Sequence, residues 1–239
     1  MSYSFIPEPI LRIYGPLYRR YFKSRVWLQY GRHHDAPLRP FHLLSIAPDQ
    51  INHVPEKKIG STFECSIRGG TWDCELNPLE ENLFYRSFKT HIERGIDWRE
   101  TDYYPAVLKK VRSGKGWKNC SNQTEVLEKL ETYDRLYEHI AEYGYKTQRA
   151  LRLGEPDGEY ELDIKYYPPE FDEITVDVGR DGTLIWHSGL HRLTIARLLE
   201  IESVPVRIRV RHAEWQQTRD TVWNDPRRSA AAHPDLTNK

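Results

Sequence analysis

A short stretch of the sequence combines residue types that can hold phosphate. Ser188 and Gly189 end a strand-like apolar run, and His191 and Arg192 begin a helical pattern directly after it. The first turn of a helix has free backbone N–H groups and the positive end of the helix dipole. Glycine lets an anion approach the backbone, and arginine can hold phosphate with two hydrogen bonds. We therefore predict a phosphate-binding turn, in which the histidine and the serine hydroxyl add further donors.

A structural interpretation of the same turn needs no ligand. Arg192 would pair with a carboxylate such as Asp177 or Asp181, while His191 would cap the helix or pack against it. An isolated Gly-x-His-Arg sequence favours this second interpretation. The choice between the two therefore depends on the elements around the turn.

Those elements follow a regular order. Residues 173–179 alternate in hydropathy like a strand, Asp-Gly at 181–182 predicts a hairpin turn, and residues 183–187 are the partner strand. Residues 190–200 predict a helix that is apolar over much of its surface and therefore buried. Residues 204–211 predict a further strand with one apolar and one basic face, which we expect to pair with acids across the sheet. The basic face consists of Arg207, Arg209 and Arg211.

This order of elements, with the segments "SGLHRLTIA" and "IESVPVRI", resembles the ParB/sulfiredoxin-like superfamily from about residue 165 to residue 215. The resemblance implies that Gly189, His191 and Arg192 bind the phosphates of a nucleotide. Members include sulfiredoxins, free-serine kinases, ParB-type CTP switches and proteins labelled ParB-like nucleases. Sulfiredoxins carry a reactive cysteine where this chain has Leu190, so we do not expect sulfinic-acid repair. The chain ends soon after the last strand, so we do not expect a helix-turn-helix DNA-binding region either.

Phosphoryl transfer also needs a carboxylate to take the proton of the acceptor, and usually Mg²⁺. We select Asp73 in "GGTWD", Glu100 in "DWRETDYY" and Asp177 as candidate catalytic acids. Aromatic residues around the first two suit the wall of a cleft, but at each single position we favour core aromatics, with the acids as solvated caps. The histidines are irregularly spaced, so we predict no metal ligands. Further acids in these segments are Asp97, Asp102, Glu170, Asp172 and Glu173.

These features favour a nucleotide-dependent phosphotransferase that acts on a small molecule. It would use a nucleoside triphosphate or diphosphate, with Mg²⁺ as a candidate cofactor. One alternative is a non-catalytic nucleotide- or phosphate-sensing module, and a second is a ParB-like nucleic-acid binder or nuclease. The chain has 35 Lys and Arg residues and 35 Asp and Glu residues, so its zero net charge argues against a general nucleic-acid binder.

Composition also bears on where the protein acts. Three cysteines without a C-x-x-C pair favour the reducing cytoplasm. No apolar run reaches the roughly 20 residues of a membrane span. Residues 8–28 place basic residues beside large apolar ones, and this pattern can form a helix lying on an anionic membrane. We favour packing of this segment on the protein, because Pro7, Pro9, Gly15 and Pro16 interrupt the pattern.

We expect an α+β protein in four segments. Residues 1–60 are a basic, partly amphipathic segment and linker, and residues 61–150 are a mainly helical region. Residues 151–224 are the ParB/sulfiredoxin-like unit of mixed sheet and helices, and residues 225–239 are a disordered tail. The strands predicted after residue 173 are too few for a whole domain, so the N-terminal part should complete it. The predicted helices of the second segment cover residues 79–94, a stretch ending near 111, and residues 122–144.

Overall fold

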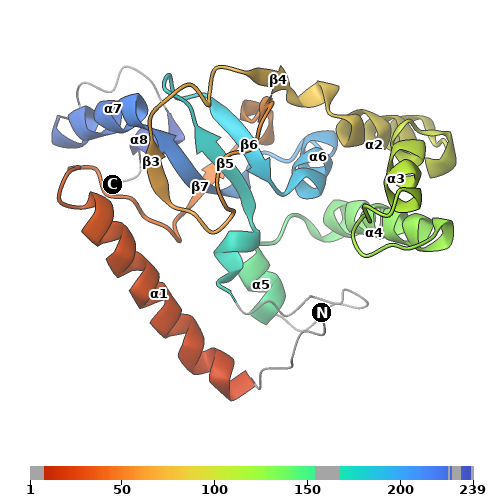
Figure 1. Cartoon of the computed structure of the whole chain (residues 1–239), viewed down its shortest axis with the longest axis horizontal. Coiled ribbons are helices and arrows are strands. Elements are labelled where there is room, and N and C mark those ends of the chain that lie inside the picture. The colour runs from red at the N-terminus through yellow and green to blue at the C-terminus, as the bar shows by residue number, and fades with distance from the viewer. Residues whose placement is uncertain (1–7, 154–166, 226, 228–232, 238–239) are drawn as a thin grey trace.

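The computed structural model describes residues 8–153, 167–225, 227 and 233–237, and it has the expected α+β fold. Within these residues a seven-stranded mixed sheet has the order β1-β7-β5-β6-β2-β4, with β3 also paired to β7 (Figure 1). The strands are β1 Leu43–Ile46, β2 His53–Pro55, β3 Ser66–Arg68, β4 Leu76–Pro78, β5 Ile174–Val178, β6 Leu184–Ser188 and β7 Val204–His212.

The predicted hairpin is confirmed. Strands β5 and β6 run antiparallel, with Thr175 opposite Ser188 and Val178 opposite Leu184. Gly182 in the connecting turn has a φ of 93°, a conformation that glycine adopts readily. Strand β7 then pairs with β5 in parallel, so the chain between β6 and β7 crosses over the sheet. This crossover carries the helix that begins directly after Gly189.

The N-terminal part contributes more of the sheet than we expected. Strands β1 to β4 all come from residues 43–78, which we had assigned to a linker and to a mainly helical region. Strand β1 pairs with the first half of β7, and β3 pairs with the second half of the same strand. Residues on both sides of the expected boundaries at 60 and 151 therefore belong to one sheet.

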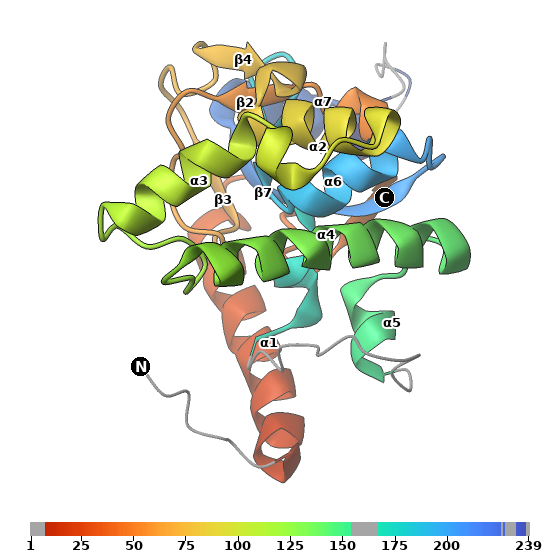
Figure 2. The same cartoon turned by 90° about the vertical axis from the view of Figure 1, so that its right-hand side faces the viewer.

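Helices cover the sheet and extend beyond it (Figures 1 and 2). Helix α6 packs against the strands, and α2, α3 and α4 gather beside it. The cap of α4 is as predicted, because the Asn122 side chain accepts a hydrogen bond from the Glu125 N–H at 3.0 Å, and the helix ends at Gly144. The helices are α1 Glu8–Tyr30, α2 Leu83–Arg94, α3 Tyr103–Arg112, α4 Gln123–Tyr143, α5 Gln148–Leu153, α6 Leu190–Leu198, α7 Ala213–Asn224 and α8 Pro234–Thr237.

Helix α1 continues through Gly15 and Pro16, where we expected an interruption. Most helical stability in proteins comes from packing of one face, and α1 has such a face in its second half. Phe22 and Val26 are buried there and pack in one cluster with Phe171. Within the described residues, no helix combines the length and apolar character needed to cross a bilayer.

The arginines of β7 are buried, and two of them pair with acids. Arg209 donates to Asp177 on the neighbouring strand, from Nε to Oδ1 at 2.9 Å and from Nη2 to Oδ2 at 2.5 Å. Arg207 donates to the backbone carbonyls of Thr62 and Glu64. The cross-strand pairing expected for this face is therefore confirmed for Arg209. Because these cations are enclosed, the strand does not present them as a nucleic-acid groove.

The end of the chain corrects our expectation of a disordered tail over residues 225–239. Asp235 in α8 is only 6% exposed, and its carboxylate accepts two hydrogen bonds from Arg211, at 2.6 and 2.8 Å. The same carboxylate lies 3.1 Å from Arg219 Nε and accepts a hydrogen bond from the Trp215 indole at 2.9 Å. The buried guanidinium groups of Arg211 and Arg219 carry charge, and this part of the tail supplies the carboxylate that pairs with them.

Candidate functional site

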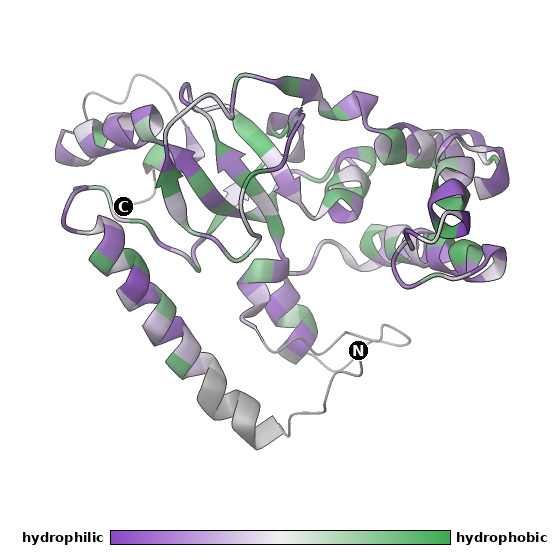
Figure 3. Ribbon diagram, viewed as in Figure 1, coloured by the Kyte–Doolittle hydropathy of each residue, from purple (hydrophilic) through white to green (hydrophobic). Residues whose placement is uncertain are grey.

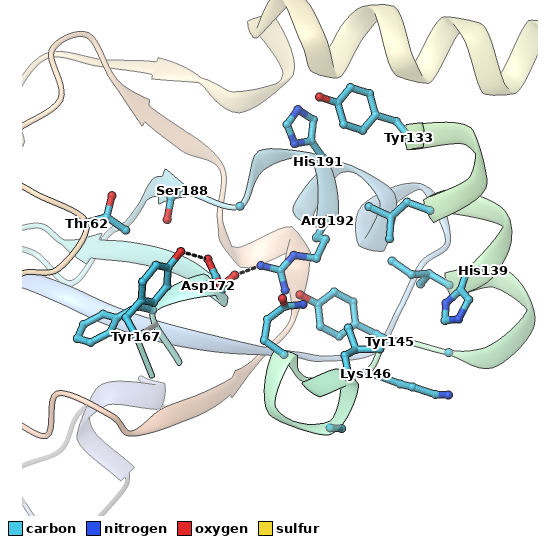
Figure 4. A pocket seen from close by; sticks show the side chains of 18 of the residues that line it. Thr62, Tyr133, His139, Tyr145, Lys146, Tyr167, Asp172, Ser188, His191 and Arg192 are labelled. Atoms are coloured by element: carbon cyan, nitrogen blue, oxygen red, sulfur yellow. Dashed lines mark hydrogen bonds between the residues drawn. The ribbon is translucent and has the colours of Figure 1, made fainter. Parts of the chain in front are cut away.

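A cavity of about 690 Å³ lies between α4, α5, α6 and the segment that precedes β5 (Figure 4). Its walls combine aromatic rings with polar groups, as is typical of small-molecule sites. All four residues of the predicted phosphate-binding turn line it. The full lining is Thr62, Phe63, Tyr133, Leu136, His139, Ile140, Gly144, Tyr145, Lys146, Gln148, Ala150, Leu151, Tyr167, Phe171, Asp172, Ser188, Gly189, His191 and Arg192.

Gly189 fixes the geometry of the turn. Its φ of 82° lies in the left-handed region, and a Cβ atom at this position would come 3.0 Å from the Ile174 Cα. Helix α6 begins at Leu190, and no side chain caps its first turn. The Gly189 carbonyl accepts from Leu193 N–H, so the N–H groups of residues 190–192 precede the first helical hydrogen bond. The predicted strand–glycine–helix arrangement is therefore present at the wall of the cavity.

Arg192 is held by the protein itself. Its Nη1 lies 3.2 Å from Oε2 of Glu173, and its Nη2 donates to the Asp172 carbonyl oxygen. The Glu173 side chain is fully buried and also accepts a hydrogen bond from Gln148 N–H at 2.6 Å. The structural interpretation of this arginine is thus confirmed, but its partner is Glu173 rather than Asp177 or Asp181.

Burial dominates the electrostatics of this pair. Desolvation raises the pKa of Glu173, and the charge of Arg192 and the hydrogen bond from Gln148 only partly oppose the rise. The same glutamate joins the N-terminal end of α5 to the first turn of α6. Arg192 also lines the cavity. Its guanidinium can therefore contact a ligand on the cavity side while it remains paired with Glu173.

His191 is packed between aromatic rings. It stacks on Tyr133 with ring centroids 4.1 Å apart and meets the Phe84 ring edge-on at 4.6 Å. Burial first, then the charges of Lys118 and Arg192, lowers the pKa of His191 well below its ordinary value. The imidazole is therefore neutral at neutral pH, and its Nε2 lies 3.3 Å from the Lys118 ammonium. Of this pair the lysine carries the positive charge, and no sequence pattern indicated it.

One wall of the cavity is aromatic. The rings of Phe63 and Tyr167 meet edge-on at 4.9 Å, and Phe171 lies 5.3 Å from Phe63. Tyr145 contributes a hydroxyl that is buried and has no hydrogen-bond partner within the described part of the chain. Burial raises the pKa of Tyr145 to about 12, so this hydroxyl keeps its proton at neutral pH. Its ring lies beside Arg192 (Figure 4).

Among the described residues, the carboxylate that lines the cavity is Asp172. It accepts a hydrogen bond from Arg152 at 2.6 Å and one from the Tyr167 hydroxyl at 2.7 Å. We had counted Asp172 among the wider set of acids but had not selected it as catalytic. One carboxylate already bonded to two donors is a poor ligand set for Mg²⁺, which takes oxygen ligands in an octahedral arrangement. The described lining therefore does not fit a protein-held Mg²⁺ site.

The three carboxylates that we selected lie elsewhere. Burial acts to raise the pKa of Asp73, but hydrogen bonds from Arg180 outweigh it and hold the pKa at about 2. That pair lies at the hairpin turn, the end of β6 opposite to Gly189. Glu100 is exposed in a turn before α3, and Asp177 is enclosed with Arg209. None of the three lines the described cavity.

Within the described residues, no group of three or more histidine, cysteine, aspartate or glutamate side chains gathers as a metal site. Comparisons of the chain with protein-family models, with curated proteins and with solved structures give no match.

Proposed function

We propose that the cavity binds a nucleotide, with a phosphate group against the N-terminus of α6. The observation that carries this proposal is the open first turn of α6 at the wall of a cavity of about 690 Å³. Backbone N–H groups and the helix dipole favour an anion there. The Ser188 hydroxyl and the free face of Arg192 are side-chain donors at the same wall. The resemblance of "SGLHRLTIA" to the ParB/sulfiredoxin-like turn points to the same ligand class.

The aromatic wall suits the other end of a nucleotide. Bases stack on aromatic rings, and Phe63 and Tyr167 provide such rings beside the turn. Tyr145 adds a buried aromatic ring and hydroxyl beside Arg192.

The reaction that we propose is phosphoryl transfer from the nucleotide to a small acceptor molecule. A hydroxyl oxygen of the acceptor would form the new bond to phosphorus, while the bond to the bridging oxygen of the nucleotide breaks. Asp172 is the lining carboxylate that can take the hydroxyl proton. The negative charge of the broken bond then stays on the bridging oxygen of the leaving nucleotide, where the first turn of α6 stabilises it.

A second candidate is a nucleotide or phosphate sensor without catalysis. Its support is that Asp172 is already bonded to Arg152 and Tyr167, while Arg192 is bonded to Glu173 and the Asp172 backbone. Such a site is rigid before the ligand arrives. For either function we place the protein in the cytoplasm, because its three cysteines, Cys65, Cys74 and Cys120, are free.

Calorimetric titration with ATP, ADP, CTP and GTP, with and without Mg²⁺, tests binding. Each nucleotide is compared with its nucleoside, which lacks the phosphate. We expect the nucleosides to bind at least tenfold more weakly, because they lose charge-assisted hydrogen bonds. Ser188→Ala should weaken nucleotide binding roughly tenfold on the same grounds. Ser203→Ala is the matched control, since this exposed hydroxyl bonds only Ser45 at 2.7 Å among the contacts described.

Equal affinity for nucleoside and nucleotide would refute the proposed contact between the phosphate and the first turn of α6. Labelled nucleotide then separates the two functions. Transfer or hydrolysis that is lost in Asp172→Asn, with nucleotide affinity retained, supports the phosphotransferase. Binding without turnover in the wild-type protein supports the sensor.

A further inference from the structure

Helix α1 presents large apolar side chains to solvent. Leu17, Tyr21, Trp27 and Leu28 are 58%, 62%, 55% and 60% exposed. With about 100° between successive helical residues, Leu17, Tyr21 and Leu28 lie within about 40° of one another around the axis. Trp27 lies on the same half of the helix. These four residues are the exposed stripe of α1.

The exposed stripe is not the face through which α1 packs on the protein, because the opposite face of the helix is buried. Phe22 and Val26 are each 3% exposed, and the Phe22 ring meets Phe171 edge-on at 5.5 Å. Arg19 pairs with Glu170 at 2.5 Å on the same side. The helix is therefore held with the stripe outward, and it projects from the body of the protein (Figure 1). Apolar and polar residues alternate along it (Figure 3).

Cations border the exposed stripe on both sides. Residues 15–34 contain five arginine and lysine residues and no aspartate or glutamate, although the whole chain has zero net charge. Helical geometry places Lys23 on one side of the stripe, Arg25 on the other and Arg20 between Leu17 and Trp27, while Arg32 follows the end of the helix. All four of these side chains are exposed.

We propose that α1 binds the surface of an anionic lipid bilayer. The helix would lie in the plane of the interface, with the leucines in the outer edge of the acyl region and Trp27 and Tyr21 at headgroup depth. The flanking cations would meet lipid phosphates, whose negative surface potential attracts clustered Lys and Arg. This proposal does not depend on the proposed function of the cavity.

The charge pattern favours a lipid surface over a second copy of the chain. In a symmetric dimer through the exposed stripe, the cations of one helix would face those of its partner. Residues 15–34 offer no acid to neutralise them. Like charges placed opposite one another oppose association, whereas anionic headgroups complement them. The same cations therefore weaken the association of two copies of the chain and strengthen binding to an anionic bilayer.

Vesicle co-sedimentation of the full chain tests the proposal. One set of vesicles is pure phosphatidylcholine, and the other contains about a third phosphatidylglycerol. We expect binding to the anionic vesicles only, and weaker binding at high salt. Leu17→Ser with Leu28→Ser should reduce binding at least tenfold. Arg20→Gln with Lys23→Gln should reduce it by an order of magnitude or more, at about fivefold per cation.

The matched control is Lys89→Gln with Lys110→Gln, which removes two exposed lysines from α2 and α3 and should leave vesicle binding unchanged. Circular dichroism and urea unfolding check that each variant folds. Equal reduction by the control pair would show unspecific charge attraction and overturn the proposal. Absence of vesicle binding, with a dimer in light scattering that Leu17→Ser and Leu28→Ser dissociate, would assign the stripe to a second copy and overturn it too.

Discussion

Arg192→Ala should destabilise the protein, and the loss should grow as the pH rises. The reason is Glu173, whose fully buried carboxylate has the Arg192 guanidinium 3.2 Å away. Desolvation already raises the pKa of Glu173 in the folded protein, and Arg192 opposes that rise. Removing the arginine raises the pKa further. The folded variant then holds a proton on Glu173 that the unfolded chain has released.

The sign and size of the effect follow from this difference in proton uptake. A carboxyl group with a raised folded pKa leaves stability intact below its unfolded pKa and lowers stability as the pH rises toward its folded pKa. Each unit by which the folded pKa of Glu173 rises costs about 1.4 kcal/mol once the pH exceeds that pKa, so the loss in the variant grows as the pH rises above an ordinary carboxyl pKa. The lost hydrogen bond to the Asp172 carbonyl adds about 1 kcal/mol at any pH.

We therefore expect a loss of about 3–5 kcal/mol in the free energy of unfolding at pH 7, the range for removing one partner of a buried ion pair, and a smaller loss at pH 5. Urea unfolding at several pH values measures it. The double variant Glu173→Gln with Arg192→Ala, compared with Glu173→Gln alone, should show a loss that does not change with pH. Arg197→Ala is a control on the same helix, because its carboxylate partner Glu80 is 68% exposed and its other donors bond Ile51 and Asn52, so the loss should not grow with pH.

A loss that is the same at pH 5 and pH 7 would refute the reasoning, since the charge of Glu173 would then have no part in it. An unchanged free energy of unfolding would refute it more directly. Arg192 would then contribute nothing to the stability of the fold, and a loss of nucleotide affinity in Arg192→Ala could be assigned to phosphate contact alone. If the expected destabilisation is found, affinity in this variant must be measured per folded molecule.

Three further predictions concern residues with defined partners. Gly189→Ala should cost about 1–2 kcal/mol in urea unfolding, because the left-handed backbone disfavours a Cβ that would also crowd Ile174; a negligible cost would contradict the geometry. Asp177→Asn should cost about 3–5 kcal/mol by leaving Arg209 poorly paired, with nucleotide affinity per folded molecule unchanged; lost turnover at full stability would instead support a catalytic Asp177. Asp235→Ala should lower the thermal midpoint clearly, whereas a disordered tail would leave it unchanged.

Periodicity predicted the long elements and missed the short ones. Helix α4 and the β5–β6 hairpin were found because each carries a full pattern and a turn or cap signal at its boundary. Strands β2, β3 and β4 have three residues each, which is too short for an alternation to stand out. Strands β2 and β3 pair with strands more than a hundred residues away, such as His53 opposite Ile185, and β4 joins the sheet through β2. No local pattern carries that information.

The candidate acids also depend on contacts between residues that are distant in the sequence. Asp73 and Glu100 were selected for their aromatic neighbours, but local composition cannot tell which cavity a side chain reaches. Asp73 is bonded to Arg180, 107 residues further along the chain. Lys118 beside His191 likewise comes from a loop brought there only by the packing of α3 and α4. Residues of this kind became visible only in the folded chain.

The correct partner of Arg192 was, by contrast, within reach of the sequence. Side chains alternate along β5, so Ile174 and Val176 face α6 while Asp177 faces the arginines of β7. Asp177 also lies opposite Ile185 in the middle of β6, away from the end of that strand where α6 starts.

The hairpin register identifies Glu173 instead. The Asp-Gly turn places the first residues of one strand beside the last residues of the other, and Thr175 lies opposite Ser188. Continuing that register by two residues brings Glu173 beside the first turn of α6. The hairpin register alone therefore points to the Glu173–Arg192 pair, because the alternation along β5 would place Glu173 on the same face as Asp177.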